Sequence, residues 1–204
     1  MIRKQVILKR KEIVVNTITK SADLINELQR EQQAHDKDYH PDILSLDTTK
    51  RVIHMSLHNA KYAARFVAAF EDHDEVLHRK TLTDAFIISV ATANALTYDL
   101  RKSISNEMSN LDDLNALGSE LQKVQGSNLT FHRRYAAQVG QMAKACESLD
   151  HLENYPFREK LTEANNTIFK LLLSDAANKK IDLASEYRAR LSQVEANSPF
   201  SIFL

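Results

Sequence analysis

Turn-forming residues are scarce in this chain, which has only three glycines and three prolines among its 204 residues. A β-sandwich or β-barrel needs a turn roughly every 8–12 residues, and glycine and proline build many of these turns. Hydrophobic residues make up 43% of the chain and charged residues 26%, which is typical of a chain that folds around a core. The sequence therefore predicts an all-α protein, an antiparallel helical bundle of about six to eight helices.

Charge, cysteine content and hydropathy exclude several classes of protein. The 27 basic and 27 acidic residues give no net charge, whereas a nucleic-acid-binding domain usually has a basic excess, so we expect no nucleic acid partner. The single cysteine, Cys146, excludes an intramolecular disulfide, and its place among alanines predicts a small core residue rather than a nucleophile. No apolar run approaches the roughly 20 residues that span a bilayer, and residues 1–10 lack a signal-peptide core. We therefore expect a cytoplasmic protein with no membrane partner.

Hydrophobic residues at helical spacing predict where the helices lie. The expected ranges are 17–33, 47–70, 81–96, 99–108 with a weaker continuation to 124, 129–149, 157–175 and 183–194. The helix over 81–96 is apolar on nearly every face, so we expect it to be the most buried element. The helix over 47–70 is expected to bury Val52, Ile53, Leu57, Ala60, Ala64, Val67 and Ala68.

The chain divides into three parts by composition. Residues 1–44 form an N-terminal helix and connection, residues 45–125 a first helical half, and residues 126–204 a second half with an apolar tail. Similar segments recur in the same order, since Leu82–Ala85 and Tyr98–Leu100 resemble Leu161–Ala164 and Ile181–Leu183. This pattern favours two related helix pairs packed within one monomer, although amphipathic helices of similar composition also look alike.

Two histidines share one face of the predicted helix over 47–70. His54 and His58 are four residues apart, a spacing that allows both to bind one metal ion, with Asp84, His73 or His78 as a further ligand. The alternative is a histidine pair beside a polar cleft.

The segment from Thr81 to Leu100 combines an acidic residue, a long apolar helix, an Ala-Asn pair and a Tyr-Asp-Leu end. It resembles the second helix of the all-α nucleoside triphosphate pyrophosphohydrolases, the MazG and dimeric dUTPase superfamily, with Asp84, Asn94 and Asp99 in step. The resemblance implies two facing helices that each carry two carboxylates one turn apart. Such carboxylates hold Mg²⁺ ions, which clamp a triphosphate and activate water.

Most acidic positions of that family are replaced in this chain. The corresponding residues are Arg65, Ala68, Thr81 and Asp84 in the first half, and Gln138, Gln141, Glu163 and Asn166 in the second. The resemblance leaves Asp84 and Glu163 as metal ligands. It implies as nucleotide-binding residues Thr81, Asn94, Gln138, Gln141 and Asn166. Neutral amides bind Mg²⁺ more weakly than carboxylates, so the implied Mg²⁺ site is degenerate.

We expect from this resemblance a protein that binds a nucleoside triphosphate, or another protein, and catalyses poorly. One alternative is an active Mg²⁺-dependent pyrophosphohydrolase with its acids in the segment Glu71–Glu75. A second is a structural or adaptor bundle without a small-molecule site. The HD phosphohydrolase superfamily is similar in the segment Arg51–His54 and in the pair His73–Asp74. Members of the MazG family dimerise, so a homodimer is the implied assembly.

Overall fold

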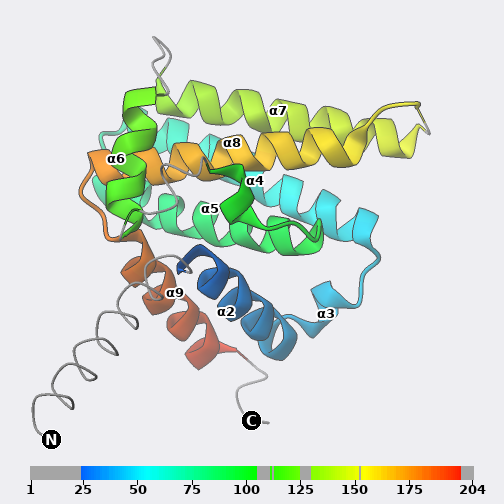
Figure 1. The fold of residues 1–204 in the computed structure, drawn as a ribbon, viewed down its shortest axis with the longest axis horizontal. Coiled ribbons are helices and arrows are strands. Elements are labelled where there is room, and N and C mark those ends of the chain that lie inside the picture. Colours follow the sequence, from blue (N-terminus) through cyan, green and yellow to red (C-terminus); the bar gives the residue numbers. More distant parts are fainter. Residues whose placement is uncertain (1–23, 105–110, 112, 125–129, 152, 199–204) are drawn as a thin grey trace, which may run out of the picture.

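The computed structural model describes residues 24–104, 111, 113–124, 130–151 and 153–198. These residues form eight α-helices and one 3-10 helix and contain no strand, which confirms the predicted all-α class (Figure 1). The helices are α2 (Leu24–Tyr39), α3 (Pro41–Leu44), α4 (Thr48–Glu71), α5 (Glu75–Ala95), the 3-10 helix η1 (Leu100–Ser103), α6 (Leu114–Val124), α7 (Phe131–Asp150), α8 (Phe157–Asn178) and α9 (Leu183–Asn197). In this part of the chain, every helix is too short or too polar to cross a membrane.

Four long helices form the centre of the molecule. A short connection joins α4 to α5 and another joins α7 to α8, so each pair is antiparallel. Because α4 packs on α7 and α5 packs on α8, the two pairs close into one four-helix bundle. The short helix α6 packs on α8, while α2 and α9 cover α5 (Figure 1).

Large aromatic side chains fill the space between the two pairs. Phe66, Phe86, Tyr135 and Phe169 are each at most 1% exposed. The rings of Phe66 and Tyr135 meet edge to face at 5.0 Å between centroids and join α4 to α7. The rings of Phe86 and Phe169 stack at 5.6 Å and join α5 to α8. Burial of one such side chain stabilises the fold by about 1.5–3 kcal/mol, so these contacts hold the bundle as a unit.

The second helix of each pair ends in the same backbone motif. Thr97 after α5 and Lys180 after α8 both have a left-handed conformation, with φ of 53° and 56°. In each case the next amide donates to a carbonyl of the last helical turn, at 3.1 and 2.9 Å, and an aspartate caps the helical segment that follows. Counted back from this motif, Asp84 corresponds to Thr167 rather than to Asn166, and neither of these residues is a carboxylate.

Two helices extend beyond their predicted ends. α2 continues through a stretch predicted as a connection and ends at Tyr39, because Pro41 disfavours helical backbone at the residue before it. α5 begins at Glu75 rather than Thr81, because the Asp74 side chain caps its first turn with a hydrogen bond of 2.9 Å. With twelve buried residues, α5 has more than any other described helix, as predicted.

The predicted inward face of α4 is wrong. Of the residues expected inside only Val52 is fully buried, while Leu57 and Val67 are 65% and 36% exposed. The buried residues are Val52, Met55, Ser56, Asn59, Tyr62, Phe66 and Ala69. This face contains polar side chains, which a hydropathy pattern assigns to solvent. Asn59 is fully buried because its Oδ1 accepts a hydrogen bond of 2.6 Å from the Tyr135 hydroxyl.

Several predicted segments lie outside the described residues. They are residues 1–16, the first part of the helix predicted over 17–33, the linker at 125–128, the tail at 200–204 and residues 105–108 of the helix predicted over 99–108. Residues Leu100–Ser103 of that last range form the 3-10 helix η1.

Candidate functional site

Asp84, the acidic residue that best matches the MazG-type motif, lines a cavity of about 320 Å³ between α2, α4, α5 and α9. Its charged lining residues are Lys61, Arg65, Lys80, Asp84 and Arg190, and its apolar wall includes Ile87, Ile88, Leu191 and Val194. Four cationic side chains thus meet one carboxylate. We call this the cationic cavity.

Both oxygens of the Asp84 carboxylate have an arginine neighbour. Arg190 of α9 donates from Nε to Oδ1 at 2.8 Å, and Nη1 of Arg65 on α4 lies 3.9 Å from Oδ2. The Asp84 side chain is only 11% exposed and that of Arg190 29%, so water and salt screen this closer pair only in part, whereas Arg65 is 41% exposed. The fold therefore holds Asp84 as the partner of two guanidinium groups.

The donors around Asp84 do not suit Mg²⁺. This ion requires near-octahedral oxygen ligands and gains most from carboxylates. Arg65 stands where the MazG-type motif has an acidic residue, and its charge repels a cation. Thr81, at another, is fully buried and its hydroxyl has no hydrogen-bond partner among the described residues. Asp84 is the one acidic residue among those that line the cavity.

Two lysines of the cavity have no carboxylate within ion-pair distance among the described residues. Lys80 projects from α5 and forms no described hydrogen bond. Lys61 of α4 lies 3.1 Å from Nδ1 of His58 and 4.6 Å from the centre of the Tyr62 ring. Burial lowers the pKa of Lys61, and the neighbouring charge of Arg65 lowers it further. The cavity therefore has positive charge that the acidic side chains of the described residues do not fully neutralise.

The predicted pair His54 and His58 does come together, with 3.2 Å between the two Nε2 atoms. Burial first, and then the charges of Lys61 and His54, lower the pKa of His58 to about 4, so its ring is neutral at neutral pH. Within the described residues, no third His, Cys, Asp or Glu completes a metal cluster with this pair. His78 instead contacts the Asp175 carboxylate at 2.6 Å.

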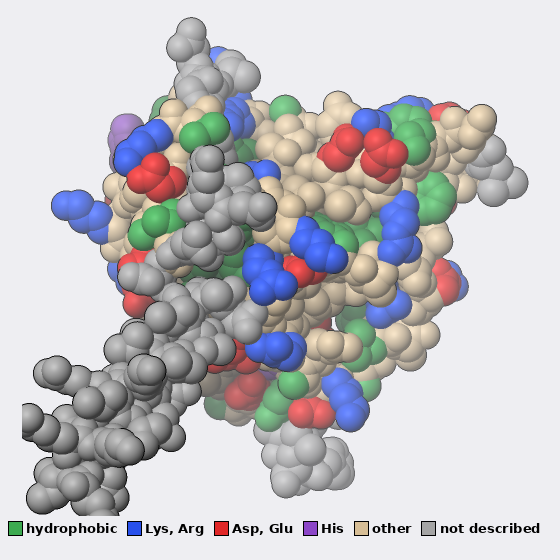
Figure 2. All heavy atoms as spheres, viewed as in Figure 1, with side chains coloured by type: hydrophobic (Ala, Val, Ile, Leu, Met, Phe, Trp, Pro, Cys, Tyr) green, Lys and Arg blue, Asp and Glu red, His purple; other side chains and the backbone are tan. Residues whose placement is uncertain are grey.

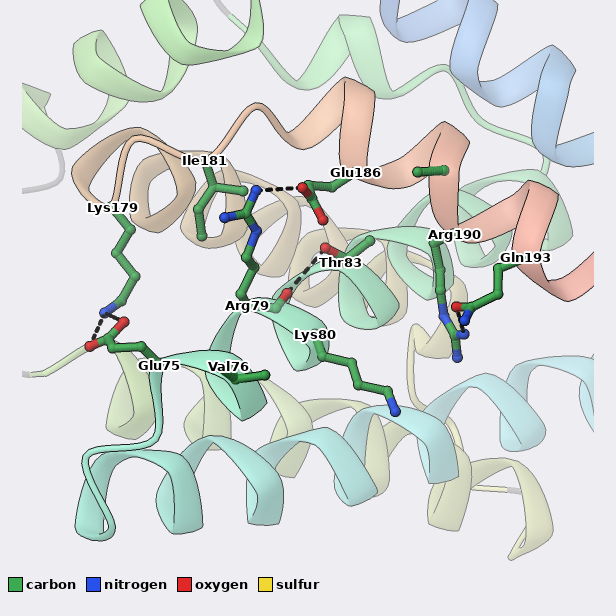
Figure 3. A pocket seen from close by; sticks show the side chains of 11 residues that line it. Glu75, Val76, Arg79, Lys80, Thr83, Lys179, Ile181, Glu186, Arg190 and Gln193 are labelled. Atoms are coloured by element: carbon green, nitrogen blue, oxygen red, sulfur yellow. Dashed lines mark hydrogen bonds and ion pairs between the residues drawn. The ribbon is translucent and has the colours of Figure 1, made fainter.

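A larger cleft of about 770 Å³ adjoins the cationic cavity between α5 and α9 (Figure 3). Lys80 and Arg190 line both hollows. In Figure 3 these two side chains lie at one end of the cleft, and the ion pair of Lys179 with Glu75, 2.8 Å long, lies at the other. A ligand in the cationic cavity thus has room to extend along α9.

The structure does not bring the other predicted metal ligand to Asp84. Glu163 is exposed on α8 and pairs with Lys160 of the same helix at 2.8 Å. Asn94 fastens α5 to α2, because its side-chain amide exchanges hydrogen bonds of 3.1 and 2.9 Å with the side chain and backbone of Gln29. Neither residue lines the cationic cavity.

The remaining predicted nucleotide-binding residues are also elsewhere. Gln138 is half-buried and Gln141 exposed on α7, and Asn166 is half-buried on α8. The acidic residues of the alternative enzyme hypothesis, Glu71–Glu75, are exposed at the tip of the α4–α5 hairpin. There Asp74 caps α5 and Glu75 pairs with Lys179.

Sequence reasoning missed Lys61, Lys80 and Arg190 as site residues. The one available signal was Arg65, a basic residue at a position that the MazG motif reserves for an acid. Arg190 lies far along the chain and reaches Asp84 only through the packing of α9 on α5. The chain matches no known protein family, no curated protein and no solved structure.

Proposed function

We propose that the protein binds a phosphorylated small molecule, with a nucleoside triphosphate as the leading candidate, in the cationic cavity and without a Mg²⁺ cage. The observation that carries the proposal is the charge of this cavity, where four cationic side chains meet one carboxylate in a chain of zero net charge. Elsewhere the charges are mixed, and Figure 2 shows basic and acidic side chains interspersed over the face it displays. Ammonium and guanidinium groups are the side chains that bind phosphate oxygens directly.

The cavity offers distinct contacts to a phosphate chain and to an apolar group. Lys61 and Lys80 enter from two different helices, and neither is paired with a carboxylate of the described residues. The Arg65 guanidinium, 3.9 Å from Asp84, is held loosely enough to turn toward another oxyanion. Ile87 and Leu191 supply an apolar wall against which a nucleobase can pack.

Efficient hydrolysis is not expected at this site. The attack of water on a triphosphate is usually promoted by a metal ion or by a carboxylate free to take a proton. Asp84 is paired with two arginines, and no other carboxylate lines the described cavity. These contacts support a protein that binds or senses its ligand rather than one that cleaves it.

The test is a calorimetric titration of the full-length protein with ATP, GTP, CTP, UTP and dUTP, with and without Mg²⁺, at constant ionic strength. We expect at least one triphosphate to bind without Mg²⁺, and Lys80→Ala to weaken binding about tenfold to a hundredfold, since a charge-assisted hydrogen bond contributes about 1.5–3 kcal/mol. Lys102→Ala, which removes the same charge from an exposed position on η1, is the matched control and should change nothing.

Asp84→Asn separates the proposal from its alternatives by the sign of its effect. If phosphate binds directly, the substitution frees Arg65 and Arg190 and should tighten binding several-fold. If Asp84 were a metal ligand of an active pyrophosphohydrolase, the substitution would abolish Mg²⁺-dependent binding and turnover. A failure of every triphosphate to bind would favour the structural or adaptor bundle.

A further inference from the structure

Three side chains of metal-ligand type gather where α2 ends. His35, Asp36 and His40, which we call the histidine cluster, each place one ligand atom within 4.8 Å of the other two. In a tetrahedral Zn²⁺ site with bonds of 2.0–2.1 Å, the ligand atoms lie about 3.3 Å apart. If side-chain rotations moved each ligand atom by about 1 Å, all three atoms could bind one ion. No second three-ligand group of this kind occurs among the described residues.

One ring nitrogen of His35 already contacts a carboxylate, as is common for metal-binding histidines. The side chain is buried, and its Nδ1 lies 3.0 Å from Oε1 of Glu195 on α9. When Nδ1 donates this hydrogen bond, Nε2 keeps its lone pair and is free to bind a metal. A carboxylate on the opposite ring nitrogen is the arrangement that fixes the tautomer and orientation of metal-binding histidines.

Asp36 is a half-buried carboxylate without a cationic partner. Its Oδ1 accepts a hydrogen bond of 2.7 Å from Nε2 of Gln32, and no lysine or arginine of the described residues pairs with it. Gln32 is itself 1% exposed and accepts a hydrogen bond of 2.8 Å from the Tyr187 hydroxyl. A chain of core hydrogen bonds thus holds this carboxylate in place. Removing an unpaired charge from water is costly, and a bound cation would remove that cost.

His40 completes the cluster from a constrained backbone position. Its amide donates to the Asp36 carbonyl at 2.9 Å, and Pro41 follows directly. Asp36 and His40 both line a cavity of about 140 Å³, together with His54 and Arg51. Arg51 forms no ion pair with Asp36.

We propose that the histidine cluster binds a Zn²⁺ ion through Nε2 of His35, the carboxylate of Asp36 and the ring of His40. Two imidazoles and one carboxylate suit Zn²⁺ rather than Mg²⁺ or Ca²⁺, which prefer oxygen ligands throughout. Three protein ligands leave a fourth position open to the cavity for water or a small ligand. This site does not depend on the proposed phosphate binding, so either proposal can fail alone.

The experiment uses the full-length protein after removal of metals with a chelator. Co²⁺ is titrated in while the visible absorption of tetrahedral Co²⁺ is followed, and Zn²⁺ is titrated in by calorimetry. We expect one ion per chain with micromolar or tighter affinity. Asp36→Asn and His40→Ala should each weaken Zn²⁺ binding at least about tenfold. His151→Ala, which removes an exposed histidine at the end of α7, is the control and should bind like the wild type.

Three results would overturn the proposal. They are no stoichiometric binding of either ion, equal binding by the wild type and both variants, and a loss of binding in His54→Ala but not in His40→Ala. The last would assign the metal to the pair of His54 and His58. Because Asp36→Asn keeps the shape of the side chain, far-UV circular dichroism of the metal-free protein distinguishes a lost ligand from a lost fold.

Discussion

Asp36 and Asp84 carry the same side chain in neighbouring cavities that share the wall formed by Ile87 and Ile88, yet their surroundings are opposite. Asp84 is paired with two guanidinium groups in a cavity that contains two further lysines. Asp36 accepts a single amide hydrogen bond and belongs to a cluster with two imidazoles. The surroundings of Asp84 therefore favour an anion, whereas those of Asp36 favour a cation.

The comparison shows that the neighbours of a carboxylate decide what it can bind. The MazG-type motif predicts that Asp84 is a metal ligand, because a sequence motif describes only the residue types along one helix. Arg190 comes from a different helix and reverses that expectation. Asp36 belongs to no motif that we identified, yet its ligand-type neighbours lie on the same short stretch of chain.

Charge reversal in the cationic cavity should give the largest effect. We expect Lys80→Glu to weaken triphosphate binding by more than about a hundredfold, because an attractive contact is replaced by repulsion between like charges. Zn²⁺ binding by the histidine cluster should stay within twofold of the wild type. Calorimetry with each ligand alone measures both affinities, and a parallel loss of Zn²⁺ affinity would show that the two cavities are not distinct sites.

Glu195→Gln tests the histidine cluster through the residue that contacts the ring of His35. We expect Zn²⁺ affinity to fall about tenfold while the tetrahedral Co²⁺ spectrum is retained, because Glu195 positions a ligand without being one. Glu186 also lies on α9 and pairs with Arg79, so Glu186→Gln serves as the matched control. Unchanged affinity in Glu195→Gln would mean that the histidine is oriented by other contacts.

The stability of the metal-free protein should separate the two carboxylates. Asp84→Asn should lower the free energy of unfolding by about 1–2 kcal/mol, because it removes the charged partner of Arg65 and Arg190. Asp36→Asn should leave it unchanged or raise it, because Asp36 has no ion pair to lose among the described residues. Urea denaturation followed by circular dichroism gives both values, and equal losses would contradict the contrast.

The smallest expected effect is a change in the pKa of His58. Burial and the charge of Lys61 hold this pKa at about 4 in the free protein. A bound triphosphate would offset the charge of Lys61 and should raise the pKa of His58 by about one unit. Titration of the His58 ring signals by NMR, with and without ligand, measures the change. The rise in the pKa of His58 should be smaller in Lys80→Ala at the same ligand concentration. A fall in this pKa on binding would contradict the proposal that the triphosphate binds beside Lys61.

The fold was largely predictable because hydrophobic periodicity reports burial wherever the buried face is apolar. That condition holds for α5, whose central turns are buried around Phe86 and Val90. It fails for α4, where Asn59 and Ser56 face the core because Tyr135 and Cys146 of α7 meet them with hydrogen-bonding atoms. The sequence cannot show such partners until the helices are packed.

The sites were less predictable for the same reason. The MazG-type motif identifies Asp84 and shows Arg65 as a departure, but the partners Lys61, Lys80 and Arg190 come from three helices. The stretch from His35 to His40 breaks the hydrophobic pattern and precedes Pro41, so the sequence predicts a connection there. In the structure residues 35–39 belong to the end of α2 and His40 follows directly, so the three ligand-type side chains lie together.

His35 lines the cationic cavity and is also a member of the histidine cluster. A metal ion on its Nε2 would fix a ring that forms part of the wall of the other cavity, so the two binding events share one degree of freedom. Any factor by which Zn²⁺ alters the affinity for a triphosphate must then equal the factor by which the triphosphate alters the affinity for Zn²⁺. If this factor differs from one, the concentration of either ligand changes the occupancy of the other ligand's site.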